Sequence, residues 1–99
     1  MAGVAITGFK NLMSGEEILC VRRDGPDPNH TYITHALKVT GQVDDGIYLG
    51  VWIEATDIGQ VIRLDHRVPL VNFPPSRKAI ASYRELIGRL DPKLFRGPE

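Results

Sequence analysis

The strongest constraint on the fold is a series of short segments in which apolar and polar residues alternate, separated by turn sequences. Residues 47–55, IYLGVWIEA, show this most clearly. Successive side chains of a β-strand point to opposite faces, so the alternation predicts a strand. One face is expected to carry Leu49, Val51, Ile53 and Ala55, and the other Tyr48, Gly50, Trp52 and Glu54. The segment therefore places two aromatic rings, with a glycine between them, on its more polar face.

Similar segments precede this strand. Residues 16–23 are apolar on both faces, which is typical of a central strand, and the Asp-, Gly- and Pro-rich residues 24–29 predict a loop. Residues 30–41 predict a longer alternating strand. Its two faces are expected to carry Ile33, His35, Leu37 and Val39 on one side and Tyr32, Thr34, Ala36 and Lys38 on the other.

Two shorter strands and one helix complete the pattern. Residues 60–65 predict a strand with Arg63 pointing outward, and residues 67–73 predict a last strand that Pro69 places at an edge. Ser76 is a suitable helix N-cap, and Asp91-Pro92 ends the helical pattern. The apolar residues with helical spacing are Ile80, Tyr83, Leu86, Ile87 and Leu90.

These elements indicate a single domain of 99 residues. We expect a strand region over about residues 1–73, a helix over about 76–90 and a short tail over 91–99. The fold class is mainly β (α+β): a small, strongly curved antiparallel sheet or β-barrel with one C-terminal amphipathic helix.

The composition argues against several classes of function. Twelve basic and twelve acidic residues give a formal net charge of zero, which lacks the broad positive field of a general nucleic-acid or membrane binder. Cys20 is the only cysteine, so no internal disulfide is expected. The sequence predicts neither a signal peptide after Met1 nor a membrane span, so we expect a cytoplasmic protein.

The histidines and potential nucleophiles do not form a recognisable catalytic or metal site. His30 and His35 would point to opposite faces of one strand, and we expect His35 to be a hydrogen-bonded core residue. No nucleophile lies beside a base in a known motif, so neither enzymatic activity nor a cofactor or metal is expected. The cluster Asp65-His66-Arg67 is either an anion site or a surface ion pair.

The aromatic face of residues 47–55 has two interpretations. If the strands over 30–41, 47–55 and 60–65 lie side by side, one outer surface carries Tyr32, Lys38, Tyr48, Trp52 and Arg63, with Gly50 as a gap. A flat ring or a partner side chain would stack in that gap. Alternatively, the helix packs on this face, and Gly50 lets Tyr83 or Ile87 approach.

The order of the segments ILCVRRDG, YITHALKV, IYLGVWIEA and GQVIRLDHRV resembles the WYL-like domain of bacterial regulators. The matching motif residues are Tyr48-Leu49 and Leu64-Asp65, whereas Ile47 and Ile62 replace aromatic residues of the family pattern. The resemblance implies an Sm-like small β-barrel that senses a nucleotide or nucleic acid through basic residues of its last strand. Gln60 and His66 replace two of those bases, so Arg63 and Arg67 are displaced candidates for the same role.

Two functions follow as expectations. The first is a non-enzymatic, regulatory or ligand-sequestering module for a nucleotide-like or oligonucleotide ligand, with Arg63, His66 and Arg67 on phosphate and Tyr48 or Trp52 stacked on the base. The second is a protein-interaction or inhibitory module that acts through the aromatic face or a sheet edge, as in small phage-encoded counter-defence proteins. Exposed aromatic residues and strand edges also predict self-association, most simply a homodimer.

Overall fold

A computed structural model describes residues 4–44, 46–65, 67 and 69–94 of the chain. The described residues form six strands and one helix: β1 (Ile6–Asn11), β2 (Glu17–Arg23), β3 (Thr31–Val43), β4 (Gly46–Val51), β5 (Ile62–Leu64), β6 (Leu70–Phe73) and α1 (Arg77–Leu90). The strands predicted from residue 16 onward and the helix are confirmed, but the strand predicted over residues 47–55 ends at Val51. The candidate site residue His66 lies outside the described residues.

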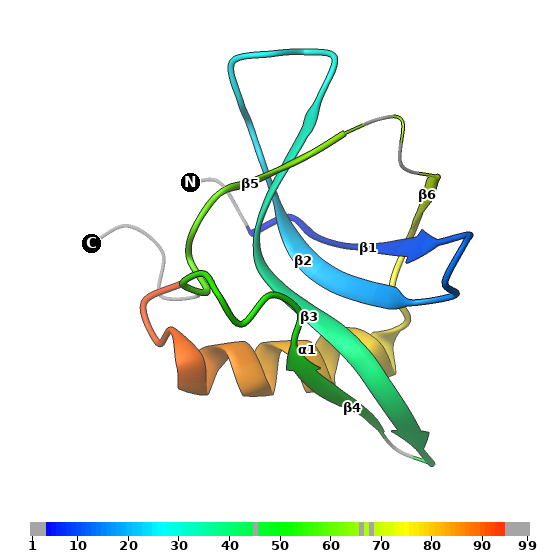
Figure 1. Cartoon of the computed structure of the whole chain (residues 1–99). Coiled ribbons are helices and arrows are strands. Elements are labelled where there is room, and N and C mark those ends of the chain that lie inside the picture. Colours follow the sequence, from blue (N-terminus) through cyan, green and yellow to red (C-terminus); the bar gives the residue numbers. More distant parts are fainter. Residues whose placement is uncertain (1–3, 45, 66, 68, 95–99) are drawn as a thin grey trace.

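The strands form one antiparallel sheet in the order β4-β3-β2-β1-β6, and β5 also pairs with β3 (Figure 1). The mainly β fold with a C-terminal helix is confirmed, whereas the expected closure into a barrel or strongly curled sheet is wrong. Within the described residues no ladder joins β5 to β6, so the sheet stays open. The physical reason is that β5 adds to the same edge of β3 as β4 does, instead of bridging to β6 at the far side of the sheet.

A β-bulge in β3 changes which side chains face the helix. Leu19 pairs with Leu37 but Val21 pairs with Thr34, so one extra residue of β3 is accommodated opposite Cys20. His35 adopts a positive φ of 55° at this point. The extra residue reverses the alternation, so the expected common face for Ile33, His35, Leu37 and Val39 is wrong: Ile33 and Leu37 belong to different apolar clusters.

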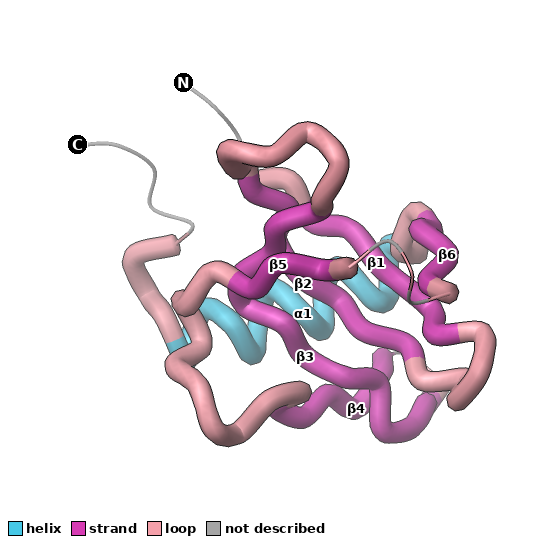
Figure 2. Tube along the Cα trace, turned by 45° about the horizontal axis from the view of Figure 1, so that its top comes forward, coloured by secondary structure: helices cyan, strands magenta, loops and turns pink. Residues whose placement is uncertain are grey.

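Two apolar clusters lie on the two faces of the sheet. The helix cluster contains Leu19, Val21, Leu37, Ala79, Tyr83 and Ile87, with Ile47 and Leu49 packed against it. The opposite cluster contains Phe9, Ile18, Cys20, Ile33, Ala36 and Leu64, with Trp52, Ile62 and Leu70 packed against it. Figure 2 shows α1 behind the sheet, so the helix covers only the first of these clusters.

Helix α1 begins and ends as the sequence predicts. The Ser76 hydroxyl accepts a hydrogen bond of 3.1 Å from the Ala79 N–H, and Asp91 forms the C-cap. The buried residues of α1 are Ala79, Tyr83 and Ile87, while Leu90 is 46% exposed although it fits the predicted stripe. The predicted apolar stripe therefore faces the sheet, but its last residue, Leu90, is not buried against the sheet.

His35 joins three parts of the fold through its backbone and its buried ring. Its carbonyl accepts a hydrogen bond of 2.6 Å from the Tyr83 hydroxyl, and its N–H donates to the Ile58 carbonyl at 2.8 Å. The ring Nε2 lies 2.8 Å from the Asp91 carboxylate and Nδ1 lies 2.7 Å from the Thr34 hydroxyl. The bulge is therefore tied to α1 and to the segment between β4 and β5, and the expected hydrogen-bonded core histidine is confirmed.

The first stability test compares a buried with an exposed residue of α1. Ile87→Ala should lower the free energy of unfolding by about 2–5 kcal/mol, because Ile87 is fully buried against the sheet. The matched change Leu90→Ala should alter it by less than about 0.5 kcal/mol, because that side chain is largely exposed. Urea unfolding monitored by circular dichroism measures both, and equal effects would contradict the packing of α1.

The second stability test measures how acid affects the contact between His35 and Asp91. The hydrogen bond from His35 holds the pKa of Asp91 below its usual value of 3.8. A carboxyl with a lowered folded pKa stabilises the fold above its unfolded pKa, and this contribution disappears as the pH falls through the folded value. Asp91→Asn should therefore lower the melting temperature at neutral pH and reduce its further decline in acid.

Melting curves from about pH 6 to about pH 2.5 test this, with the exposed Asp44→Asn variant as control. Asp44→Asn should follow the parent at each pH. An Asp91→Asn protein with the parent's acid profile would contradict a stabilising role of the His35–Asp91 contact.

Candidate functional site

The structure places the described candidate residues in different surroundings. Tyr48 is 59% exposed on β4, and Arg63 is exposed on β5. Trp52 follows β4 and packs against the cluster opposite the helix, and its indole N–H donates to the Glu16 carboxylate at 2.9 Å. Arg67 is exposed beyond β5.

Tyr48 and Arg63 lie toward different ends of β3. Tyr48 pairs with Gly41 and Arg63 pairs with Tyr32. Those partners are nine residues apart on one strand, a separation of up to roughly 30 Å at the usual rise per residue. The expected side-by-side arrangement of the three strands is wrong, because β4 and β5 follow one another along the same edge of β3.

The alternative position for the helix is also wrong. The side chains of β4 that pack against the helix cluster are Ile47 and Leu49, on the face opposite Tyr48. A Cβ at Gly50 would meet Thr40 and Lys38 at 3.5 and 3.9 Å, and neither belongs to α1. Gly50 is therefore not a gap that admits the helix, and Tyr48 is not part of the core.

The charged side chains near β5 balance one another. Arg67 donates to both carboxylate oxygens of Asp65, with a shortest distance of 2.7 Å, so the surface ion-pair interpretation is confirmed. Hydrogen bonding from Arg67 holds the pKa of Asp65 well below its usual range. Arg63 forms no hydrogen bond or ion pair with any described residue. The pKa of Asp27 is lowered mainly by the hydrogen bond from the Asn29 N–H and by that with His30, and the positive charge of Arg63 adds to this effect.

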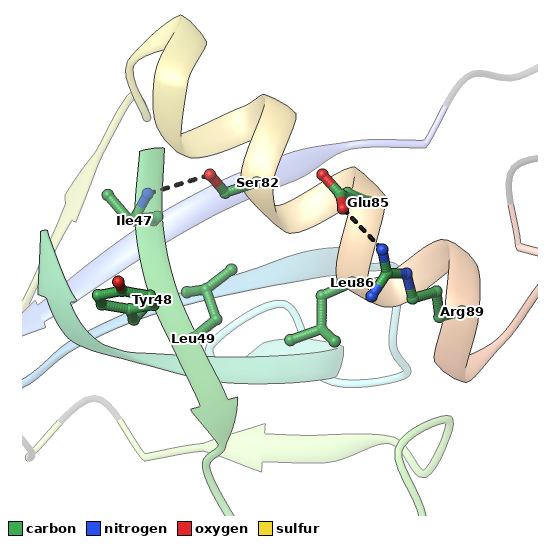
Figure 3. Close-up of a pocket in the computed structure, with 7 residues that line it drawn as sticks. All are labelled: Ile47, Tyr48, Leu49, Ser82, Glu85, Leu86 and Arg89. Carbon is green, nitrogen blue, oxygen red and sulfur yellow. Dashed lines mark hydrogen bonds and ion pairs between the residues drawn. The ribbon is translucent and has the colours of Figure 1, made fainter. Parts of the chain in front are cut away.

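A groove of about 240 Å³ lies between β4 and α1 (Figure 3). Its apolar walls are the side chains of Leu49 and Leu86, which come from the strand and from the helix. At one end the Ser82 hydroxyl accepts a hydrogen bond of 3.1 Å from the Ile47 N–H. At the other end Glu85 and Arg89 form an ion pair of 2.9 Å.

Beyond the Ser82 contact, no residue with a described position hydrogen-bonds to the outer backbone of β4. The Ile47 N–H points to α1, whereas the Trp52 N–H points to the Ala36 carbonyl on β3 at 3.4 Å. Because backbone groups alternate along a strand, Leu49 and Val51 share the direction of Ile47 and point their N–H and C=O groups away from β3. The outer edge of β4 is thus able to pair with another strand.

The two edges of the sheet differ in their protection. Proteins usually guard edge strands with charged residues, proline or bulges. Pro69 and Pro74 bracket the four-residue β6, whereas β4 contains no proline and no charged residue. The β3–β4 ladder has a bulge between Val39 and Gly41, but its extra residue belongs to β3 and not to the edge strand. The unguarded edge of β4 and the adjoining groove are therefore the candidate interaction site. Alternation identifies β4 as a strand, but the sequence gives no signal for its position at the edge.

No family model, curated protein or solved structure matches this chain. The resemblance to WYL-like domains therefore stays a prediction. None of the described helices is long and apolar enough to cross a membrane. Among the residues with described positions, no three His, Cys, Asp or Glu side chains form a possible metal site.

Removal of the Ser82 hydroxyl tests the hydrogen bond between α1 and β4 at one end of the groove. Ser82→Ala should make the Ile47 amide exchange faster with solvent, because its hydrogen-bond acceptor is lost. The free energy of unfolding should fall by about 0.5–1.5 kcal/mol. Glu85→Gln, which removes an exposed ion pair from the same helix, serves as control and should leave the Ile47 amide unchanged.

Hydrogen exchange followed by NMR gives the rate for each amide. An Ile47 amide that exchanges at the parent's rate in the Ser82→Ala protein would contradict the contact between α1 and β4.

Proposed function

We propose that this chain is a non-enzymatic protein-interaction module that binds an extended segment of a partner as an additional strand on β4. The observation that supports this function best is the edge of β4, without proline or charged residues, beside a groove whose walls include Leu49 and Leu86. Strand addition to an exposed sheet edge is a common mode of peptide recognition.

The backbone and the groove would contribute differently. The outward N–H and C=O groups of Leu49 and Val51 would hydrogen-bond to the partner's main chain, which provides affinity without selecting a sequence. A side chain of the added strand would enter the groove between Leu49 and Leu86. The two charged residues at the groove already pair with each other, so an uncharged, apolar side chain is the expected occupant.

The test uses a synthetic peptide of alternating threonine and valine as probe, which favours an extended conformation and carries no side-chain charge. With dilute protein, the probe should shift the NMR signals of the Leu49 and Val51 amides. Val51→Pro should abolish the shift because proline lacks the N–H donor, and an edge position with an outward N–H tolerates proline.

Val51→Ala is the matched control, because it shortens the side chain but keeps the N–H. It should retain the response to the probe. Probe-induced shifts that leave Leu49 and Val51 unchanged, or that persist in Val51→Pro, would contradict strand addition at this edge.

Arg63 favours nucleotide binding as a second candidate function. It is an exposed cation with no hydrogen bond to a described residue, so it is available to phosphate. Arg67 would have to exchange its contact with Asp65 for the ligand. Tyr48 lies far along β3 from Arg63, so only an extended oligonucleotide would reach both.

Arg63→Ala measures this candidate directly. It should weaken the binding of a short single-stranded oligonucleotide by about 1.5–3 kcal/mol, the usual contribution of a charged hydrogen bond. The melting temperature should not change, because Arg63 is exposed. Fluorescence anisotropy at low salt measures the affinity, and equal binding by parent and variant would exclude Arg63 from a phosphate site.

A further inference from the structure

The open edge of β4 and the residue after it have a sequence that is symmetric in chemical type. Tyr48, Leu49, Gly50, Val51 and Trp52 run aromatic, aliphatic, glycine, aliphatic, aromatic. We propose that the partner of the β4 edge is a second copy of this chain, paired antiparallel about a twofold axis at Gly50. This inference rests on the proposed function and names its partner.

The backbone allows this register. Leu49 and Val51 are the positions with outward N–H and C=O groups, and a twofold axis at Gly50 places Leu49 of one copy opposite Val51 of the other. Such a pair exchanges both of its backbone hydrogen bonds. The two Gly50 residues then form the non-hydrogen-bonded pair between them, with Cα atoms about 4.5 Å apart.

The contact between β4 and α1 limits the length of this ladder. The Ile47 N–H already donates to Ser82, so it is not available to a second strand. Pairing is confined to the residues on either side of Gly50. The assembly is therefore a closed dimer about one twofold axis, and each copy uses the same surface.

The groove accommodates one of the side chains from the second copy. Val51 lies on the face of β4 that carries Leu49 and is 36% exposed. Opposite Leu49, the Val51 side chain of the second copy would enter the groove between Leu49 and Leu86. The Leu49 and Leu86 side chains would provide the apolar contact for this valine, and Ser82 and the Glu85–Arg89 ion pair lie at the ends of the groove.

The opposite face would bring the aromatic residues together. The same register places Tyr48 of one copy opposite Trp52 of the other, at two equivalent positions. The Trp52 indole is fixed by its hydrogen bond to Glu16, whereas Tyr48 is largely exposed in the single chain. Gly50 leaves room between the two aromatic pairs, and cross-strand aromatic pairs stabilise sheets.

Net charge does not oppose this association. None of the five residues around the axis carries a charged side chain, and the chain has a formal net charge of zero. Two copies therefore have no net long-range repulsion to overcome. The Lys38 side chain, whose Cε lies 3.9 Å from a Cβ at Gly50, has a flexible stem that lets its ammonium group turn away from the axis. The short ladder indicates a weak dimer that forms with rising protein concentration.

A cysteine at the axis tests the register. In Gly50→Cys the new side chains of two copies face each other within the Cα range that a disulfide allows. A Cβ at Gly50 meets Thr40 at 3.5 Å, an ordinary contact, so the single chain should tolerate the change. The native Cys20 is fully buried and burial raises its pKa to about 12, so it should not react.

Val51→Cys is the matched control. In the proposed register the two Val51 residues are diagonal neighbours about 7–8 Å apart, beyond the reach of a disulfide. With oxidised glutathione as the oxidant, Gly50→Cys should form a covalent dimer in good yield and Val51→Cys should not. A monomeric product from Gly50→Cys, or preferential cross-linking of Val51→Cys, would overturn the inference.

Light scattering on the parent provides the second measurement. Its mass should rise toward that of a dimer with concentration, and Val51→Pro should weaken dimerisation by about tenfold to a hundredfold, because each copy loses one backbone donor. A parent that stays monomeric would also overturn the inference. The proposed function would survive that outcome if the threonine–valine probe still shifts the Leu49 and Val51 amides, and would fail with it if the probe has no effect.

Discussion

The fold depends on the β-bulge at His35. One extra residue in β3 lets the strand serve both apolar clusters, because the residues before and after it face opposite sides of the sheet. The positive φ of His35 is maintained by hydrogen bonds to Tyr83, Ile58, Thr34 and Asp91. Buried polar groups are costly when unpaired, so this fully bonded histidine specifies how α1 and the segment before β5 meet the sheet.

That arrangement determines which part of the β4 edge remains available for pairing. Tyr83 and Ile87 pack α1 against β2 and β3, and Ser82, the residue before Tyr83, accepts the hydrogen bond from the Ile47 N–H. One end of β4 is thereby closed and the other remains open. The candidate interaction site is a consequence of where the helix packs, rather than of a catalytic or metal-binding cluster.

Much of the secondary structure could be predicted from the sequence, because alternation and capping are local. The strands predicted over residues 16–23 and 30–41 are present, and Ser76 and Asp91 mark the ends of α1 as predicted. The bulge could not be predicted, since His35 fits a regular alternation and only the pairing of β3 with β2 reveals the extra residue. The expected common face of Ile33 and Leu37 was consequently wrong.

The site was predictable only in part, because strand order is not a local property. Tyr48 and Trp52 were identified as unusual for a polar face, and the glycine between them as a point of close approach. The separation of Tyr48 from Arg63 follows from the addition of β4 and β5 to the same edge of β3, which no residue pattern indicates. The groove between β4 and α1 could not be predicted either, because it depends on where the helix packs.

The outer edge of β4 is the proposed interaction surface of this chain. Hydrogen exchange of the Leu49 and Val51 amides, measured at low and at high protein concentration, tests it most directly. If the edge pairs with a second copy, protection of these two amides should increase with concentration while the Ile47 amide, already bound to Ser82, changes little. Exchange rates of Leu49 and Val51 that do not depend on concentration would contradict pairing of this edge between copies.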